Sequence, residues 1–511
     1  MTKHKPIYWT LVPVLVFAIL FVYFLPFETK TIYGDDLGFY REHFKLHTFT
    51  DWLNCTATDQ KFRPVTGIID GMLIHLTDKH LHGYYVFSIL VQTIITVVFA
   101  AIINLLVSAP LFAFFISILI GTSRFALFNI TQLYWGGPME GVAMIFFLWA
   151  VYLLMKAFIS TDNSNKNNYK MLLYVTAIAN MAMYTHERYL VLFPFLVLVA
   201  FFYPFRSSLA TSQKIFVVVS GVLSLAVNYV LKTYVYGYPF LMGTSGQQLK
   251  FSPATALGSL NDGLLSMLQI NTGGEMMIGN SFAISEMAFQ VIAIVLVASM
   301  ALVSVMYCLG LWKKQDSNAA SYASKPIIIF LLVLLFFTMA PAVATIRLEQ
   351  RWLQAPFSLF IIMLVTALVR VKTRSAIVKN GLFAAFIALF ILSDHNYLYK
   401  GAPKMFAIKA EKTARMLKDA AQNGTIKPQI ADLYIEEDWW LFSEWVTQQG
   451  YLFYYYQGVT KQVRFHHELP DDKSGYVIPV EDLAAGVGQV ISVKEDSVTD
   501  ITARYLVSGG R

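Results

Sequence analysis

Residues 84–107, YYVFSILVQTIITVVFAAIINLLV, form an uncharged apolar run that is long enough to cross the roughly 30 Å hydrocarbon core of a membrane as one helix. Similar runs recur along most of the chain. Of its 511 residues, 56% are hydrophobic and 14% are charged, whereas about a quarter of the residues of soluble proteins are charged. A water-soluble protein of this length could not bury so much apolar surface. The composition therefore predicts a polytopic α-helical membrane protein.

The apolar runs predict about eleven transmembrane helices. These spans lie near residues 7–27, 84–107, 111–130, 139–158, 171–186, 190–205, 215–232, 287–310, 326–345, 355–370 and 380–394. The first run follows Lys3 and Lys5, as the apolar part of a cleaved signal peptide would. Because it is long and bulky and lacks a small-residue cleavage pattern, we expect it to be retained as a span.

The cationic residues predict the orientation of the chain. Short loops on the N-terminal side carry many Lys and Arg residues against only Asp162 and Asp316, so we expect this side to be cytoplasmic. The same loops explain much of the net charge of +7, which therefore gives little reason to expect nucleic acid as a partner. With an odd number of spans, the tail from residue 397 emerges on the extracytoplasmic side.

We therefore expect a transmembrane domain over residues 1–396, with outer loops at 28–83 and 233–286, and a small extracytoplasmic α/β domain over 397–511. In this tail, residues 404–422 have an amphipathic helical pattern, while 430–436, 451–456, 476–480 and 489–493 have strand patterns. Residues 254–270 have apolar side chains at helical spacing and fit either an interfacial helix or a plain loop. The sequence contains no phosphate-binding glycine loop, and its two cysteines exclude a disulfide framework.

Two groups of ionisable residues lie in the first outer loop. Asp35 and Asp36 directly follow the first span and could act as a general base or bind a metal ion, although Gly-Asp-Asp is also ordinary turn composition. Arg63 comes later in the loop. Its planar guanidinium suits a phosphate or carboxylate, and the alternative is an arginine that reaches to lipid headgroups.

Two further groups lie at outer ends of later spans. His186, Glu187 and Arg188 separate two apolar runs, and charged groups at that depth are costly unless they pair or serve a site. Arg347 and Arg351, with Glu349 between them, would share one face of a helix and form a clamp for phosphate. Trp352 alone would also fit the aromatic belt of a membrane protein, but the belt does not explain these outer arginines.

The positions of these residues resemble the GT-C class of membrane glycosyltransferases, which use polyprenyl-phosphate sugars as donors. The layout of spans and an outer C-terminal domain is also similar to that of protein O-mannosyltransferases and aminoarabinose transferases. The motifs that carry the resemblance are Asp35-Asp36 after the first span, Arg63-Pro64 later in that loop, and Arg351-Trp352 with Pro356 before a late span.

The resemblance implies an inverting glycosyltransferase of the hexosyltransferase type in the bacterial cytoplasmic (inner) membrane. Asp35 or Asp36 would accept the proton of the attacking hydroxyl, and the arginines would hold the polyprenyl-phosphate leaving group. The implied partners are a lipid-linked sugar donor and a glycan or glycolipid acceptor of the cell envelope, such as lipopolysaccharide or O-antigen. No cofactor is certain. The two aspartates could hold Mg²⁺ or Mn²⁺, but the arginines could neutralise the phosphate without a metal ion, so we predict no metal site.

Two other functions remain open at this point. An O-antigen-type polysaccharide polymerase would also bind lipid-linked sugars, but it would not require a carboxylate pair directly after the first span. A transporter or flippase of lipid-linked sugars would use the charged residues to line a path. That function predicts ionisable residues near the middle of the membrane and internal repeats.

Overall fold

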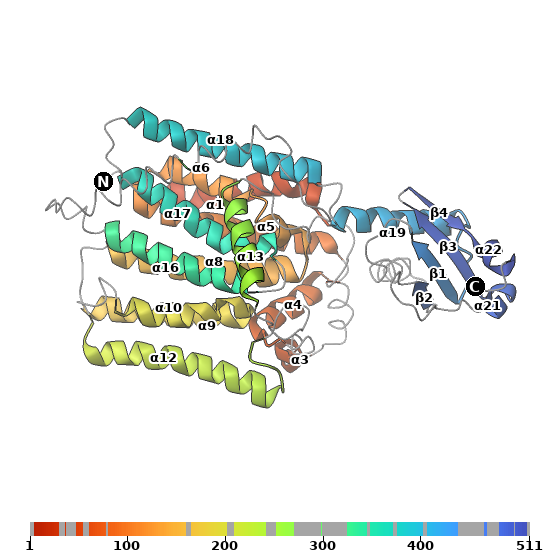
Figure 1. The fold of residues 1–511 in the computed structure, drawn as a ribbon, viewed down its shortest axis with the longest axis horizontal. Coiled ribbons are helices and arrows are strands. Elements are labelled where there is room, and N and C mark those ends of the chain that lie inside the picture. The colour runs from red at the N-terminus through yellow and green to blue at the C-terminus, as the bar shows by residue number, and fades with distance from the viewer. Residues whose placement is uncertain are drawn as a thin grey trace. The chain divides into compact units, whose positions relative to one another are not determined.

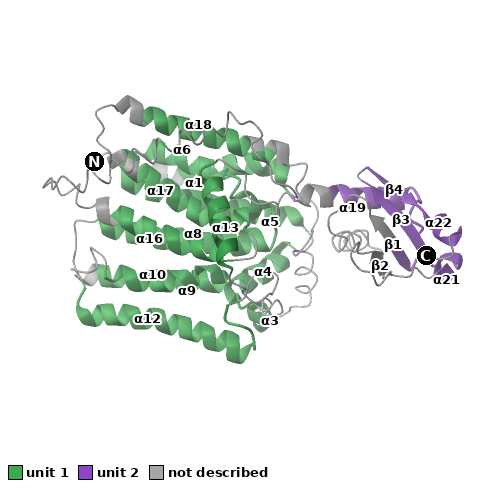
Figure 2. Cartoon of the chain, in the orientation of Figure 1, with its two compact units in different colours: residues 1–28, 43–402 green, residues 29–42, 403–511 purple. Residues whose placement is uncertain are grey.

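The computed structural model describes residues 5–29, 36, 48–54, 61–77, 80–159, 165–201, 209–241, 252–269, 298, 324–344, 348–370, 376–401, 406–437, 464–467, 480–494 and 496–507. Its contacts divide the chain into two compact units, which Figure 2 shows in different colours. Unit one contains residues 1–28 and 43–402, and unit two contains residues 29–42 and 403–511. The predicted start of the extracytoplasmic domain at residue 397 stays a prediction.

Unit one is a bundle whose long helices lie side by side in Figure 1. The longer helices are α1 (Lys5–Phe24), α4 (Pro64–Thr77), α5 (Leu81–Val107), α6 (Pro110–Gly121), α8 (Val142–Ile159), α9 (Asn165–Thr185), α10 (Leu192–Val199), α12 (Thr211–Val230), α13 (Pro253–Met267), α16 (Ser324–Val343), α17 (Gln354–Arg370) and α18 (Ala376–Gly401). Short segments connect or extend them: η1 (Leu25–Phe27), α3 (Phe49–Asn54), α7 (Leu127–Thr131), η3 (Trp135–Gly141), η4 (Glu187–Val191), η5 (Leu231–Val235) and η8 (Gln350–Leu353).

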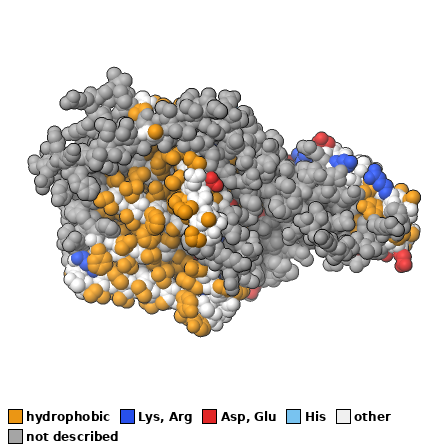
Figure 3. Space-filling view, viewed as in Figure 1, with side chains coloured by type: hydrophobic (Ala, Val, Ile, Leu, Met, Phe, Trp, Pro, Cys, Tyr) orange, Lys and Arg blue, Asp and Glu red, His pale blue; other side chains and the backbone are white. Residues whose placement is uncertain are grey.

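Among the residues that the structure describes, three segments of this bundle are long and apolar enough to cross a membrane: Leu81–Val107, Trp135–Ile159 and Thr211–Val235. Shorter apolar helices cover Leu11–Phe27, Pro110–Gly121, Ile327–Val343 and Asn380–His395. On the face shown in Figure 3, hydrophobic side chains also cover most of the described surface of unit one, as expected of a surface that faces lipid. The helical, apolar architecture is thus as predicted, whereas the number of about eleven spans stays a prediction.

The predicted span 111–130 is interrupted in the structure. Helix α6 ends at Gly121 and α7 begins at Leu127, and the Arg124 side chain between them is fully buried. A charged side chain inside a span is costly unless it is paired, so the chain leaves the helix where Arg124 finds its partners. Residues 254–270, for which a helix and a loop were both open, form helix α13, which begins at the N-cap Ser252.

Unit two contains a small sheet with the strand order β2-β1-β3-β4. The strands are β1 (Asp432–Glu437), β2 (Arg464–His467), β3 (Gly488–Lys494) and β4 (Ser497–Asp500), and the helices are α19 (Phe406–Gln422), α21 (Val480–Ala484) and α22 (Thr502–Val507). Strand β1 pairs in parallel with β2 and β3, while β4 is antiparallel to β3. The patterns at 404–422, 430–436 and 489–493 thus correspond to α19, β1 and β3. The predicted strand 451–456 lies outside the described residues, as does 476–480 up to its last residue.

Candidate active site

The segment WGGPMEG, residues 135–141, forms a π-helical turn, η3, at the beginning of α8. Two of its glycines allow the backbone of this turn to lie in close contact with α5 and α7. A Cβ atom at Gly136 would lie 2.5 Å from the carbonyl oxygen of Phe128, and one at Gly137 would lie 2.5 Å from the Oγ of Ser88. Side chains at these positions would therefore push η3 away from α5 and α7. Single π-turns of this kind are frequent at functional sites, and this one carries Glu140.

Glu140 is 4% exposed and lies among three cationic or ionisable side chains from two other segments. Arg188 donates from Nη1 to Oε2 at 3.2 Å and from Nη2 to Oε1 at 3.0 Å. His186 Nε2 lies 3.3 Å and Arg351 Nε lies 3.6 Å from Oε1 of the same carboxylate. A buried carboxylate needs such partners, because an unpaired charge in the interior is strongly unfavourable. Glu140 is therefore the centre of the cluster.

The 3-10 turn η8 holds Arg351 in this cluster. Glu349 Oε2 lies 2.6 Å from Arg351 Nε, and the guanidinium carbon lies 4.1 Å from the centre of the Phe128 ring. Trp352 is 6% exposed, and its ring lies 5.2 Å from the guanidinium carbon of Arg188. The alternative that Trp352 belongs to a lipid-facing aromatic belt is therefore wrong, because the ring packs inside the bundle against a cation.

Arg63 and Glu187 form an ion pair beside the Glu140 cluster. The Arg63 Nε donates to Oε2 at 2.5 Å and its Nη2 donates to Oε1 at 2.6 Å, in the two-pronged geometry that guanidinium and carboxylate groups favour. The Arg63 guanidinium also lies 5.4 Å from the ring of Trp135, as does the ammonium of Lys61. Because η4 carries both Glu187 and Arg188, it connects this pair to the Glu140 cluster.

The protonation states follow from these contacts. Burial raises the pKa of the Glu187 carboxyl, but the Arg63 guanidinium lowers it by more, so the pKa lies well below its ordinary value. Burial lowers the pKa of the His186 imidazole to about 4, although Glu140 acts in the opposite direction. The Arg188 backbone N–H donates to His186 Nδ1 at 3.1 Å, which assigns the proton of the neutral ring to Nε2, facing Glu140.

The arginines and glutamates of the described site balance in charge, and two lysines leave the site positive. Three arginines, Arg63, Arg188 and Arg351, face three glutamates, Glu140, Glu187 and Glu349, as the preceding distances show. Two lysines add positive charge at the same place: Lys61 at Trp135, and Lys232 of η5, which is 2% exposed and donates to the Phe240 carbonyl at 3.0 Å. With His186 neutral, the cluster is positive overall and suits an anion.

The structure thus brings six of the nine predicted site residues together: Arg63, His186, Glu187, Arg188, Glu349 and Arg351. Asp35 and Arg347 lie outside the described residues. Asp36 is buried, but its segment, residues 29–42, groups with unit two, so its place relative to the arginines stays a prediction.

The sequence-based prediction missed Glu140 and Lys232. Each is an ionisable residue at the end of a long apolar run, and such residues are functional candidates by default. This was the available signal for both. Among the residues described, no group of three or more His, Cys, Asp or Glu side chains is arranged to hold a metal ion.

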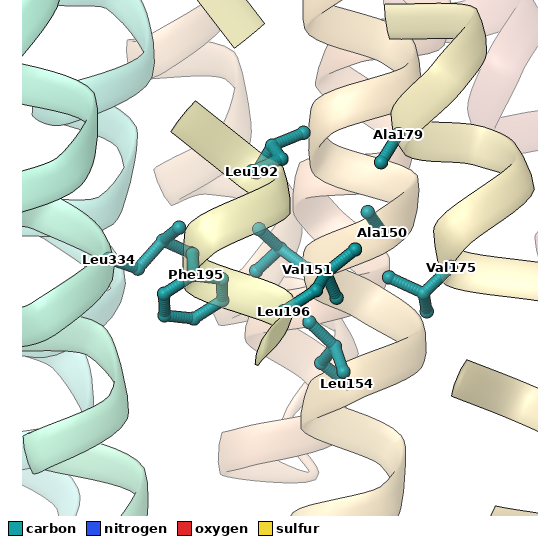
Figure 4. A pocket seen from close by; sticks show the side chains of 9 residues that line it. All are labelled: Ala150, Val151, Leu154, Val175, Ala179, Leu192, Phe195, Leu196 and Leu334. Atoms are coloured by element: carbon teal, nitrogen blue, oxygen red, sulfur yellow. The ribbon is translucent and has the colours of Figure 1, made fainter. Parts of the chain in front are cut away.

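A small cavity lies elsewhere in the bundle, between α8, α9, α10 and α16 (Figure 4). Its walls are wholly apolar, and they include Val151, Phe195, Leu196 and Leu334. A charged donor or acceptor would lose its hydration there without finding a polar partner. The cavity is therefore a gap in the helix packing and is unsuited to the chemistry of the charged cluster.

Comparison with known proteins finds similarity of fold among solved structures. No family model matches the chain, and no curated protein matches its sequence. Among solved structures, the crystal structure of ArnT from Cupriavidus metallidurans bound to undecaprenyl phosphate aligns with a TM-score of 0.46 and 10% sequence identity, over 98% of this chain and 94% of that chain. At this similarity the activity must be argued from the chain's own residues.

Proposed function

We propose that this protein is an integral membrane glycosyltransferase that moves a sugar from a polyprenyl-phosphate donor to a hydroxyl of a surface glycan or lipid-linked glycan. The proposed location is the outer face of the cytoplasmic membrane, with the N-terminus cytoplasmic. A lipid-linked donor suits that location, because nucleotide sugars are absent there and the activated sugar must arrive on a lipid carrier.

The observation that carries the proposal is the state of Arg351. Its Nε is held beside Glu349, and its guanidinium lies against the Phe128 ring. Its side chain is 16% exposed, so part of the guanidinium is left open by the described parts of the chain. A guanidinium that is fixed at one edge and open at the other presents two parallel donors, the geometry that binds a phosphate.

The position of the cluster in the bundle favours an enzyme over a transporter. Arg63 precedes α4, Glu140 precedes α8, and Glu187 begins the turn after α9. The charged side chains therefore lie at helix ends, where a lipid headgroup could meet them, whereas a transport path needs ionisable groups along the middle of its spans.

The proposed mechanism is a direct displacement with inversion. The acceptor hydroxyl attacks the anomeric carbon of the sugar, the bond from that carbon to the phosphate oxygen breaks, and the hydroxyl proton passes to Asp35 or Asp36. The leaving phosphate needs no proton from an acid, because positive charge from Arg351 and the neighbouring cations stabilises it as it departs.

Binding of undecaprenyl phosphate to the full-length protein in lipid nanodiscs tests the donor site. Arg351→Lys keeps the charge but removes the two parallel donors, so we expect binding to weaken by about tenfold, or roughly 1.4 kcal/mol. Arg415→Lys is the matched control, because Arg415 is exposed on α19 and pairs with Glu411 one turn away. Equal affinity of the Arg351→Lys variant and the wild type would contradict the proposed phosphate site.

Sugar transfer in reconstituted liposomes tests the base. Polyprenyl-phosphate sugars and candidate glycan acceptors would be supplied to the wild type, Asp35→Asn and Asp36→Asn. We expect one of the two variants to lose transfer by a factor of about 10² or more, the usual contribution of a general base, while retaining undecaprenyl phosphate binding. Wild-type transfer rates in both variants would show that neither aspartate is the base.

A further inference from the structure

Helix α13 lies against the turn that carries Arg351. Gly263 faces this turn: a Cβ atom there would lie 3.4 Å from the terminal methyls of Leu348 and Leu353, and 3.1 Å from Met339 of α16. Leu348 and Leu353 bracket the stretch from Glu349 to Arg351, so this face of α13 touches both ends of what we call the arginine turn, residues 348–353. Figure 1 shows α13 running across the direction of α16 and α17.

Arg124 connects the C-terminal end of α13 to the rest of the bundle. Its Nη2 donates to the Ser266 carbonyl at 2.7 Å and to Ser266 Oγ at 3.1 Å. Its Nη1 donates to Ser393 Oγ of α18 at 3.0 Å. The Arg124 backbone N–H donates to Asp394 Oδ2 at 3.3 Å, and the Arg124 Nε lies 3.9 Å from Asp394 Oδ1. One fully buried side chain thus joins α13 and α18.

This arrangement has a clear electrostatic basis. Ser266 lies in the last turn of α13, where the helix dipole is negative, and its carbonyl also accepts from the backbone N–H of Gln269 at 3.0 Å. A cation at this end stabilises the helix, and Asp394 compensates the charge of the cation. The remainder of α13 has weaker anchoring, since Leu257 is 66% exposed and Leu264 is 41% exposed.

We propose that Arg124 is a positioning residue that holds the C-terminal end of α13 against the arginine turn and thereby fixes the orientation of Arg351. The effect on donor binding rests on the proposed function, but the anchoring of α13 does not. An ion pair that merely stabilised the bundle would leave α13 in place when both charges were removed, because neutral replacement of a buried pair is often tolerated.

Cysteine labelling in the full-length protein separates these alternatives. The background replaces Cys55 and Cys308 with Ser, and the reporter is Met267→Cys on α13, at a position 1% exposed in the structure. Leu257→Cys, at an exposed position of the same helix, is the control reporter. The charge-balanced pair Arg124→Gln with Asp394→Asn removes the anchor without leaving a lone buried charge.

Release of α13 should raise the rate of maleimide labelling at position 267 by at least about tenfold, which corresponds to an opening made easier by about 1.4 kcal/mol. Labelling at position 257 should not change. Arg124→Lys, which keeps one donor for Ser266, should give an intermediate rate at position 267. An unchanged rate at position 267, or an equal rise at both positions, would overturn the anchoring role.

Undecaprenyl phosphate binding to the same variants tests the link to Arg351. The charge-balanced variant should bind the probe several-fold more weakly than the wild type. Unaltered affinity with faster labelling would overturn the effect on Arg351. If the wild type itself did not bind the probe, the proposed donor site would fail, while the labelling result would still decide whether Arg124 anchors α13.

Discussion

At the scale of single residues, one carboxylate organises the candidate site. Glu140 faces Arg188, Arg351 and His186, side chains from two segments that are far apart in the sequence. Without its charge, two partly buried guanidiniums would lie close together, and among the described carboxylates Glu349 would remain to compensate Arg351. Like charges at such a distance in a poorly solvated interior repel strongly. Glu140 should therefore be needed for the folded site as well as for its chemistry.

Glu140→Gln tests this structural role. The amide keeps the shape of the side chain but removes the charge that pairs with Arg188, so we expect the free energy of unfolding to fall by about 3 kcal/mol, as when a buried pair loses one partner. Thermal unfolding of the purified protein in detergent measures the loss. Glu411→Gln is the control, because its pair with the exposed Arg415 should contribute well under about 1 kcal/mol. Equal melting temperatures for the two variants would contradict the central role of Glu140.

His186 should make the stability depend on pH. Its folded-state pKa of about 4 lies below the ordinary value of 6.5, so between these values the unfolded chain binds a proton that the folded protein does not. The stabilisation is complete above pH 6.5 and is lost as the pH falls towards 4, amounting to a loss on the order of 2 kcal/mol at pH 5.

Unfolding measured at pH 7 and pH 5 in the wild type and in His186→Gln isolates this contribution from that of the other histidines. The variant should lose less stability on acidification than the wild type. The same pH dependence in His186→Gln and the wild type would show that His186 is not buried in the neutral form.

At the scale of elements, the contact between α13 and the arginine turn can be tested with two glycines of the same helix. Gly263→Leu must displace Met339, Leu348 or Leu353, whereas a Cβ atom at Gly258 would meet nothing within 4 Å. We therefore expect Gly263→Leu to weaken undecaprenyl phosphate binding by about tenfold, the scale of a 1–3 kcal/mol overpacking penalty, and Gly258→Leu to leave binding unchanged. Equal binding by both variants would contradict the close packing of α13 on this turn.

The sequence predicted the ends of the elements that form the site, but not how their side chains pair. Apolar runs and the asymmetry of cations placed Arg63, Glu187 and Arg351 at one end of the bundle, and the structure does bring them together. The pairing itself was not predictable, because Arg63 and Glu187 are 124 positions apart and the pattern gives only the end of each helix. Glu140 was missed because it was counted as part of an apolar span. The break at Arg124 was missed because its partners lie in α13 and α18.

At the scale of the whole molecule, the proposed chemistry depends on the orientation of the chain, because a lipid-linked donor is needed only where nucleotide sugars are absent. The positive loops predict that the turn before α12 is cytoplasmic and that the C-terminal domain is outside. In a background without Cys55 and Cys308, Val507→Cys should react with a membrane-impermeant maleimide in spheroplasts, since Val507 is 90% exposed. Ser212→Cys, at an exposed position beside Lys214, should react only after permeabilisation. The opposite labelling pattern would place the Glu140 cluster on the nucleotide-sugar side and remove the reason for a polyprenyl-phosphate donor.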